Sequence, residues 1–215
     1  MSWALDHLGE ILSRAGQHAW LAGIPLVLGL LIALPLGWLA ARKAWLKGPL
    51  LSGTGLLYTI PSLALFILLP SILKRGILDP VNVIVAMTIY TVALLTRTVA
   101  DALSSVDPST RAAATAMGYG GFARFRAVDL PLAVPVLAAG LRVAAVSNVS
   151  IVSVASLIGV NQLGYFLTNG YARSFATEVW VGIIACVALA VVFDVAIHGI
   201  ARLLTPWARA AEARS

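Results

Sequence analysis

Three ionisable side chains recur along one apolar segment of the chain. Asp194, His198 and Arg202 are spaced four residues apart, so a helix through this segment would carry all three on one face. Ionisable groups inside a membrane-spanning helix pair with one another or relay protons. We expect these three groups to neutralise one another as a structural ladder, and a proton relay is the alternative.

Sequence motifs for covalent catalysis, nucleotide binding or metal binding do not occur in this chain. It has no G-x-x-x-x-G-K-[ST] phosphate loop and no H-E-x-x-H zinc motif, and its one cysteine, Cys186, lies in an apolar run. We therefore expect no catalytic residue, no cofactor and no metal site. We also expect this chain to have no ATPase site of its own.

A polar set of residues occupies another apolar segment. Ser147, Ser150, Ser153 and Ser156 recur every three residues, with Asn148 beside the first. On a helix of 3.6 residues per turn, this spacing drifts by about 60° at each step and spreads over about half of the circumference. Small polar residues of this kind favour close packing between helices. The alternative is that Asn148, Ser150 and Ser153 line a polar path.

The segments that hold these residues are long and apolar. Of the 215 residues, 60% are hydrophobic and 11% are charged, and the mean hydropathy is +0.93. Soluble domains carry about 25% charged residues, and about twenty apolar residues cross the hydrocarbon core of a membrane as a helix. We therefore predict an all-α integral membrane protein with about five transmembrane helices, at roughly 19–41, 53–73, 81–100, 132–159 and 179–204.

The segments outside these spans fix the expected topology. Residues 1–18 form a predicted N-terminal amphipathic segment, residues 19–204 a transmembrane domain and residues 205–215 a cytoplasmic tail. Eleven of the fifteen Lys and Arg residues fall on the side of the 101–131 loop, and the positive-inside rule assigns that side to the cytoplasm. Because the net charge of +6 is placed between apolar runs, it indicates contact with membrane lipid and not with nucleic acid.

The polar loop at 101–131 has the sequence features of two short helices around a glycine. Asp107 is a favourable N-cap and Pro108 fits the first helical position. Residues 109–117 are rich in Ala, and Gly118 is placed for a left-handed C-terminal cap. A second short helix is expected over 122–128, stopped before Pro131.

Two aromatic side chains lie in the second of these expected helices. Phe122 and Phe125 are three residues apart, so both rings project from one side of a helix. They would either enter a groove on a partner protein or pack onto the spans of this protein. The residues alone leave both interpretations open.

The loop resembles the cytoplasmic loop of permease subunits of bacterial binding-protein-dependent ABC importers. That loop has the pattern E-A-A, three residues, G, nine residues and then I-x-L-P. The same spacing appears here, with the matching positions Ala112, Ala113, Ala114, Gly118, Val128, Leu130 and Pro131. Two positions depart from the pattern, because Ala112 replaces the glutamate and Val128 replaces the isoleucine. The first change removes a charge that could contact the ATPase.

Two further stretches are similar to the osmoprotectant branch of these permeases, which imports glycine betaine, carnitine, choline and similar solutes. One stretch is 58–66, which contains Pro61 and Ser62, and the other is 153–159, followed by Leu163 and Gly164. Together with the polar set at 147–156, these stretches give our candidates for the translocation path: Pro61, Ser62, Asn148, Ser150 and Ser153.

The resemblance implies a fold, partners and a location. The fold is the MetI-like bundle of a type I ABC importer permease in the bacterial cytoplasmic membrane. The partners are two copies of an ATP-binding subunit, a second permease copy or paralogue, and an extracytoplasmic substrate-binding protein. The loop that couples to the ATPase would contain Ala112, Ala113, Ala114, Gly118, Phe122, Phe125, Leu130 and Pro131. The alternatives are a methionine-type amino-acid permease and a stand-alone secondary transporter.

Overall fold

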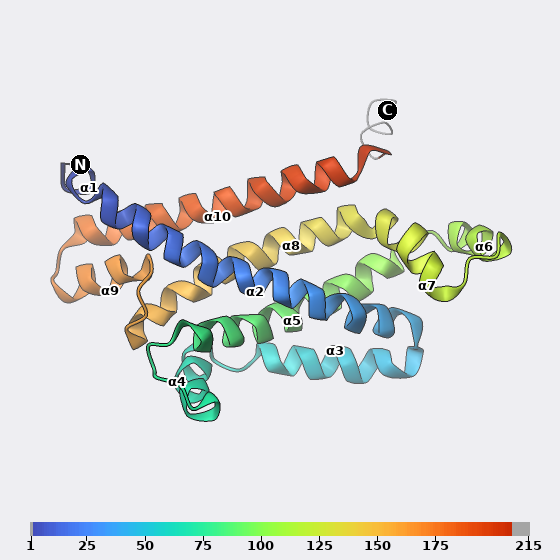
Figure 1. Ribbon diagram of the computed structural model, residues 1–215, viewed down its shortest axis with the longest axis horizontal. Helices are drawn as coiled ribbons and strands as arrows, with labels where there is room; N and C mark the ends of the chain where they lie inside the picture. The colour runs from blue at the N-terminus through green and yellow to red at the C-terminus, as the bar shows by residue number, and fades with distance from the viewer. Residues whose placement is uncertain (1, 208–215) are drawn as a thin grey trace.

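The computed structural model describes residues 2–207, and within that range the protein is built from helices without a β-strand. Four helical segments are long and apolar enough to cross a membrane: α2 (Leu8–Arg42), α5 (Pro80–Ser104), the continuous segment Gly121–Ile158 and α10 (Ala176–Leu204). A fifth crossing exists if α3 (Ala44–Tyr58) and α4 (Ser62–Leu73) form one bent span. The predicted all-α bundle is confirmed (Figure 1).

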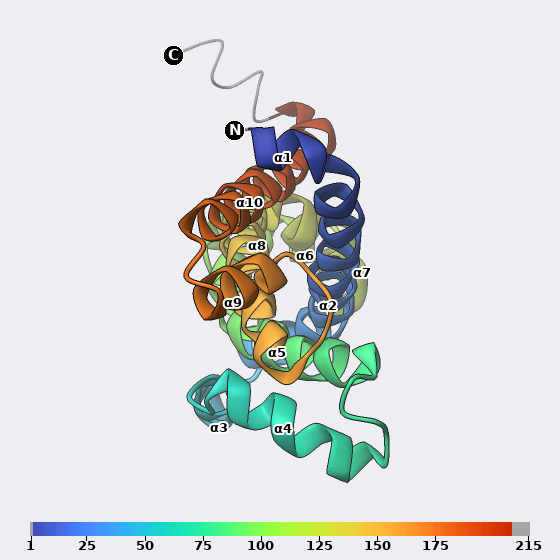
Figure 2. The same cartoon turned by 90° about the vertical axis from the view of Figure 1, so that its left-hand side faces the viewer.

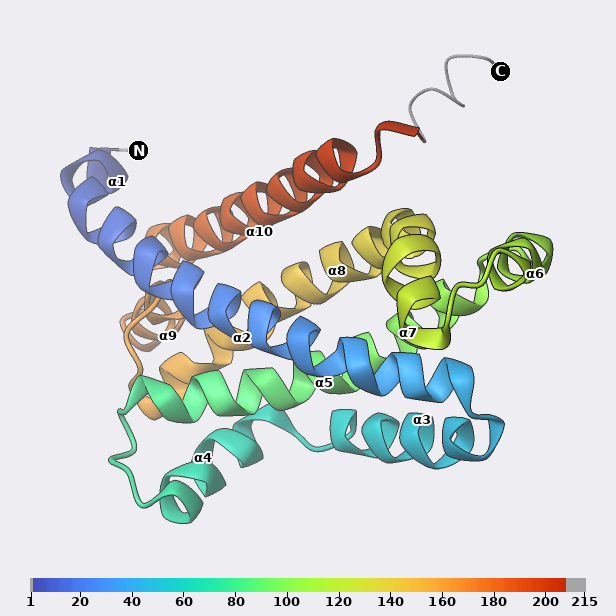
Figure 3. The ribbon, with the colours of Figure 1, turned by 45° about the vertical axis from the view of Figure 1, so that its right-hand side comes forward.

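The long helices lie side by side and place the loops at two ends of an elongated bundle. The short helices α6 (Pro108–Ala116) and α7 (Gly121–Arg124) lie at the same end as the C-terminus of α10, which we call the loop end. Helices α1 (Ser2–Asp6) and α9 (Gly164–Ala172) lie at the opposite end (Figures 1 and 3). This arrangement matches the predicted separation of the N-terminus from the 101–131 loop. Most of the predicted tail at 205–215 falls outside the described residues.

The first span begins earlier than its sequence suggests. We predicted a separate amphipathic segment over 1–18, but α2 runs without interruption from Leu8 to Arg42, and only α1 is separate. Nothing in this stretch stops a helix, and Pro25 and Pro35 are accommodated inside it, as membrane helices allow. His18 is fully buried, and its Nε2 lies 2.9 Å from the carbonyl oxygen of Val149, which anchors the extended part of α2 to α8.

The predicted continuous helix at 53–73 is wrong. Helix α3 starts at Ala44, ends at Tyr58, and is followed after a 95° bend by α4 (Figure 2). Pro61 causes the break, because proline has no amide N–H and disfavours the helical conformation of the residue before it. The chain passes Pro61 in an extended conformation, and the Tyr90 hydroxyl donates a hydrogen bond to the Ile60 carbonyl freed by the break.

The expected stop before Pro131 is also wrong. Helix α7 continues through a π-helical turn, η1 (Phe125–Asp129), directly into α8 (Leu130–Ser153). In this turn the Leu130 N–H bonds to the Phe125 carbonyl, five residues earlier. The wider turn accommodates the ring of Pro131, which would collide with a carbonyl in a regular helix. The loop end is thereby joined rigidly to a membrane span.

The fourth span ends where the sequence indicates. Helix α8 is followed by a 3-10 turn, η2 (Val154–Ile158), which ends at Gly159 in the left-handed conformation. The following segment, expected as a loop over 160–178, contains α9. Its Phe166 is buried, and the ring of Trp3 from α1 packs edge-on against it. These contacts close the end of the bundle opposite to the loop end.

Helices α2 and α5 approach closely at two glycines. A Cβ added to Gly37 would lie 2.5 Å from the Cβ of Val99, and one added to Gly29 would lie 2.4 Å from the Cγ2 of Thr91. Small residues at such positions let the backbones of membrane helices pack together. These two positions therefore set the distance between the two helices.

We expect Gly37→Ala to destabilise the bundle by about 1–3 kcal/mol, because the added methyl group overpacks the α2–α5 contact. The measurement is the thermal unfolding midpoint of the purified protein in detergent. Gly48→Ala in α3 is the matched control, since a Cβ at Gly48 meets no atom of residues 2–207 within 4 Å. Equal midpoints for the two variants would contradict the close packing described above.

Candidate functional site

The loop end contains the short helix α6, which begins where the sequence predicts. The Asp107 side chain accepts a hydrogen bond from the Ser109 N–H, and Pro108 occupies the first turn of α6. The Ser109 hydroxyl also donates to Asp107, and together these bonds hold the pKa of Asp107 below its ordinary value. The cap is therefore ionised at neutral pH. Within α6, Ala114 is buried while Ala112 and Ala113 face outward.

The end of α6 is a glycine cap of the predicted kind. Gly118 has a φ of +86°, its N–H bonds to the Thr115 carbonyl at 3.0 Å, and the Tyr119 N–H bonds to the Ala114 carbonyl at 3.1 Å. This pair of bonds is a Schellman motif, which favours glycine at the left-handed position. Gly118 therefore reverses the chain from α6 toward α7, as its place in the sequence indicates.

The two phenylalanines of the loop have different surroundings. The Phe125 ring is half-buried and packs against Trp38 of α2, with ring centroids 5.4 Å apart. Phe122 keeps 66% of its surface exposed, although its ring and the Trp38 ring are nearly perpendicular, with centroids 6.5 Å apart. Packing on the protein's own spans thus accounts for Phe125. Phe122 stays a predicted docking residue, and Met117 of the cap is also exposed.

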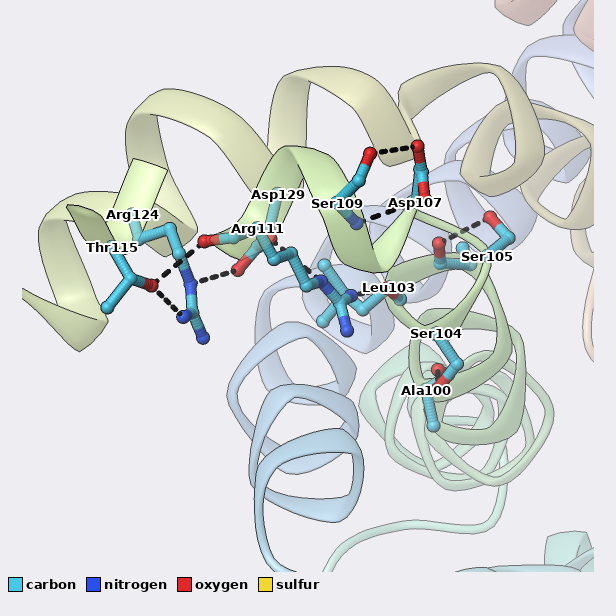
Figure 4. Close-up of polar contacts among 11 residues, drawn as sticks. Ala100, Leu103, Ser104, Ser105, Asp107, Ser109, Arg111, Thr115, Arg124 and Asp129 are labelled. Atoms are coloured by element: carbon cyan, nitrogen blue, oxygen red, sulfur yellow. Dashed lines mark hydrogen bonds and ion pairs between the residues drawn. The ribbon is translucent and has the colours of Figure 1, made fainter. Parts of the chain in front are cut away.

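A buried carboxylate ties the two parts of the loop together. The Asp129 side chain is 8% exposed, and its oxygens accept from Arg111 Nε at 3.1 Å and from Arg124 Nε at 3.4 Å (Figure 4). Arg124 also donates to the Thr115 hydroxyl at 2.9 Å, and Arg111 donates to the carbonyl of Leu103. The cluster therefore fixes α6, α7 and the end of α5 relative to η1.

This cluster was not predicted from the sequence. Arg111 and Arg124 contributed only to the charge count that set the topology, and Asp129 was only a variable position of the loop pattern. A signal was present, because Asp129 is the one carboxylate among several arginines between Asp107 and the fourth span. The two last residues of the pattern, Leu130 and Pro131, are half-buried at the start of α8, so they join the loop to the span.

Asn148 lies inside the bundle and binds three helices together. Its side chain is 3% exposed, its Nδ2 donates to the Ala22 carbonyl at 3.2 Å, and it exchanges hydrogen bonds with the Thr91 hydroxyl at 3.0 and 3.2 Å. These partners come from α2 and α5. Within a single subunit, Asn148 therefore holds α2, α5 and α8 together.

The other path candidates lie at two separate places. Ser150 is exposed on α8, and the half-buried Ser153 donates its hydroxyl to the Ser150 carbonyl at 2.6 Å. Pro61 is exposed at the α3–α4 bend, and Ser62 is half-buried at the start of α4. Among the described residues, no hydrogen bond joins these four to Asn148. A role in a translocation path stays a prediction for all of them.

We expect Asn148→Ala to lower the thermal midpoint of unfolding, by about 0.6–2 kcal/mol of stability, because interhelical hydrogen bonds in membranes are worth that much. Ser150→Ala, two residues further along α8, is the control and should leave the midpoint unchanged. If holding the helices together is its only role, Asn148→Ala should transport at the wild-type rate once folded. Loss of transport by Asn148→Ala at an unchanged midpoint would instead place Asn148 on the path.

The predicted Asp194–His198–Arg202 ladder is replaced by a pair between two helices. Arg142 of α8 donates from Nε to one oxygen of Asp194 at 2.6 Å and from Nη2 to the other at 2.7 Å. His198 and Arg202 are exposed further along α10. The guanidinium fork matches a carboxylate with two parallel bonds, so Arg142 is favoured over the local ladder. Sequence spacing along one helix could not reveal a partner on another.

The chain is similar to known proteins along nearly its whole length. The family model described as "Binding-protein-dependent transport system inner membrane component" matches residues 33–210. The osmoprotectant import permease protein OsmW of Salmonella typhimurium is 35% identical over 95% of this chain and 96% of its own length. The glycine betaine/carnitine/choline transport system permease protein OpuCB of Bacillus subtilis is 28% identical over 96% of this chain and 94% of its own.

The fold has a counterpart among solved structures. An inward-facing structure of the MetNI methionine ABC transporter superposes with a TM-score of 0.81 at 22% identity, covering 91% of this chain and 96% of that one. This likeness confirms the predicted MetI-like bundle. The family match over residues 33–210 shows that the chain belongs to the inner membrane component family of binding-protein-dependent transport systems.

Proposed function

We propose that this protein is the membrane-spanning subunit of an ATP-binding-cassette importer for a small osmoprotectant such as glycine betaine, carnitine or choline. The observation that carries the proposal is the 35% identity to an osmoprotectant import permease over 95% of the chain. Further relatives whose names specify glycine betaine, carnitine or choline are 25–29% identical over at least 91% of the chain.

In this proposal the protein works in the bacterial cytoplasmic membrane with several partners. Two ATP-binding subunits engage the loop end, an extracytoplasmic substrate-binding protein delivers solute at the opposite end, and a second permease copy or paralogue completes the transmembrane pore. The excess of Lys and Arg on the side of the 101–131 loop supports a cytoplasmic loop end. The chain itself performs no covalent step.

The loop end is suited to transmit motion of the ATP-binding subunits to the spans. Met117 and Phe122 present exposed apolar side chains that can enter a groove on a partner. Behind them, Asp129 holds α6 against η1, and η1 continues into α8. A displacement of α6 is therefore passed to a membrane span through a buried ion cluster and a continuous helix. In the proposed cycle, closure of the ATP-binding subunits moves the loops and switches the spans between inward-open and outward-open states.

Solute uptake by vesicles tests the proposed substrate class. The protein is reconstituted with its ATP-binding subunit and binding protein, ATP is enclosed on the side of the loop end, and the uptake of labelled glycine betaine, carnitine, choline and methionine is compared. We expect uptake of at least one of the three osmoprotectants and none of methionine. Uptake of methionine alone would replace the proposal by the amino-acid alternative. Uptake that follows a proton gradient without ATP would favour a secondary transporter.

A further inference from the structure

An ion pair lies near the middle of two spanning helices. Arg142 and Asp194 are each about 15 Å or more from either end of their helices, α8 and α10, at a rise of 1.5 Å per residue. Their two hydrogen bonds of 2.6 and 2.7 Å form a bidentate contact. Such a pair holds α8 and α10 together, but that role alone does not require either side chain to be accessible.

Both side chains are nevertheless accessible from outside the subunit. Arg142 is 39% exposed and Asp194 is 30% exposed. A charged group at this depth is costly in contact with lipid and faces either a bundle interior or a water-filled cavity. Trp180, Ile184 and Val187 are exposed on the same side of α10 as Asp194. The ion pair interrupts this apolar side at a depth where lipid is an unfavourable neighbour.

The exposed parts of the pair form the wall of a cavity between α8 and α10. This cavity has a volume of about 360 Å³, and its lining residues are Ala139, Arg142, Val143, Val146, Ser147 and Asp194. Ligand sites in proteins have about 300–1,000 Å³ and combine apolar walls with a few placed polar groups. The cavity thus has the size and composition of a site for a small solute.

We propose that this cavity is a binding station for a zwitterionic solute on the translocation path, an inference that rests on the proposed function. The solute carboxylate binds Arg142, and the quaternary ammonium lies beside Asp194. Arg142 uses Nε and Nη2 for Asp194, and within residues 2–207 its Nη1 has no hydrogen-bond partner. The guanidinium therefore keeps donors for a second carboxylate.

The chemistry of a betaine fits this pair. A quaternary ammonium has no N–H to donate, so its recognition needs a negative charge or an aromatic face. Asp194 supplies the charge, because none of the described residues that line the cavity is aromatic. The solute lies antiparallel to the Arg142–Asp194 pair, and the pair does not have to open. The resulting site is weak, as conduction requires, because a solute that binds tightly cannot leave.

Equilibrium binding of labelled glycine betaine to the permease–ATPase complex, without the binding protein, tests this inference. The wild-type complex should bind saturably. The double variant Arg142→Gln with Asp194→Asn removes both charges and leaves no unpaired charge. We expect its affinity to fall about tenfold, the effect of losing one charge-assisted hydrogen bond. Ser147→Leu, which fills the cavity and leaves the pair intact, should have the same effect.

The matched control is Arg97→Gln with Asp101→Asn, an exposed pair on α5 with 3.8 Å between its nitrogen and oxygen atoms. It should bind glycine betaine as the wild type does. Retention of the ATP-binding subunit reports folding, and Ser147→Leu decides the question if the neutral double variant does not fold. Unchanged affinity in the variants, or lost affinity with unchanged uptake, overturns the binding station. Failure of the wild type to import any osmoprotectant overturns the proposed function instead.

Discussion

Gly118→Val is expected to reduce coupled transport strongly while the spans still insert into the membrane. Gly118 holds a φ of +86°, and a residue with a side chain reaches this region only at a cost of about 1–2 kcal/mol, with β-branched residues the least tolerant. Helix α6 has only nine residues and depends on its caps. Since about 1.4 kcal/mol changes an equilibrium tenfold, loss of the cap raises the population of displaced α6 about tenfold or more, although Arg111 still pairs with Asp129.

The measurement for this variant is uptake and ATP turnover in the same vesicles, together with retention of the ATP-binding subunit on an affinity column. Gly118→Asn is the control, because asparagine adopts the left-handed conformation more readily than other side chains. A Cβ at this position meets no atom of the described part of the chain within 4 Å, so the control adds no clash there. Normal coupled uptake by Gly118→Val would remove the cap from the coupling mechanism.

Asp129→Ala is expected to cause the second large loss of coupled uptake. Removing one member of a buried ion cluster leaves charges without a partner and costs about 3–5 kcal/mol. The loss of stability should lie toward the lower end of this range. Arg111 and Arg124 are each 29% exposed, so they recover some hydration when Asp129 is removed. Without Asp129, α6 is no longer fixed to η1. We expect ATP hydrolysis to continue while uptake falls at least about tenfold.

Asp101→Ala is the matched control for this variant. Asp101 lies at the same end of the bundle, but its pair with Arg97 is exposed and has a separation of 3.8 Å. Exposed pairs of this kind contribute about 0–1 kcal/mol. Uptake by the Asp101 variant should therefore be unchanged, and equal behaviour of the two variants would show that the buried cluster does not link the loop to α8.

Local chemistry made the ends of α6 predictable from the sequence. Asp107 and Pro108 start a helix through bonds to their immediate neighbours, and Gly118 ends it through its own backbone freedom. The apolar runs likewise predicted four of the five expected spans, because a membrane imposes their length. In each case the residues that decide the structure are close together in the sequence.

Long-range partners and helix distortions were not predictable in this way. Asp129 and Arg111 are 18 residues apart, and Arg142 and Asp194 are 52 residues apart, so no pattern along one helix pairs them. The effect of each proline on its helix was not predictable for a different reason. Pro61 breaks a helix while Pro131 is absorbed by a π turn, and the neighbouring packing decides between these outcomes.

ATP-driven uptake in vesicles with and without the ATP-binding subunit tests the central claim most directly. Both preparations contain the permease and the binding protein, ATP is supplied at the loop end, and imported solute and released phosphate are measured together. The account predicts uptake with phosphate release when the ATP-binding subunit is present, and neither when it is omitted. Equal uptake without that subunit would contradict the assignment of this chain as an importer permease.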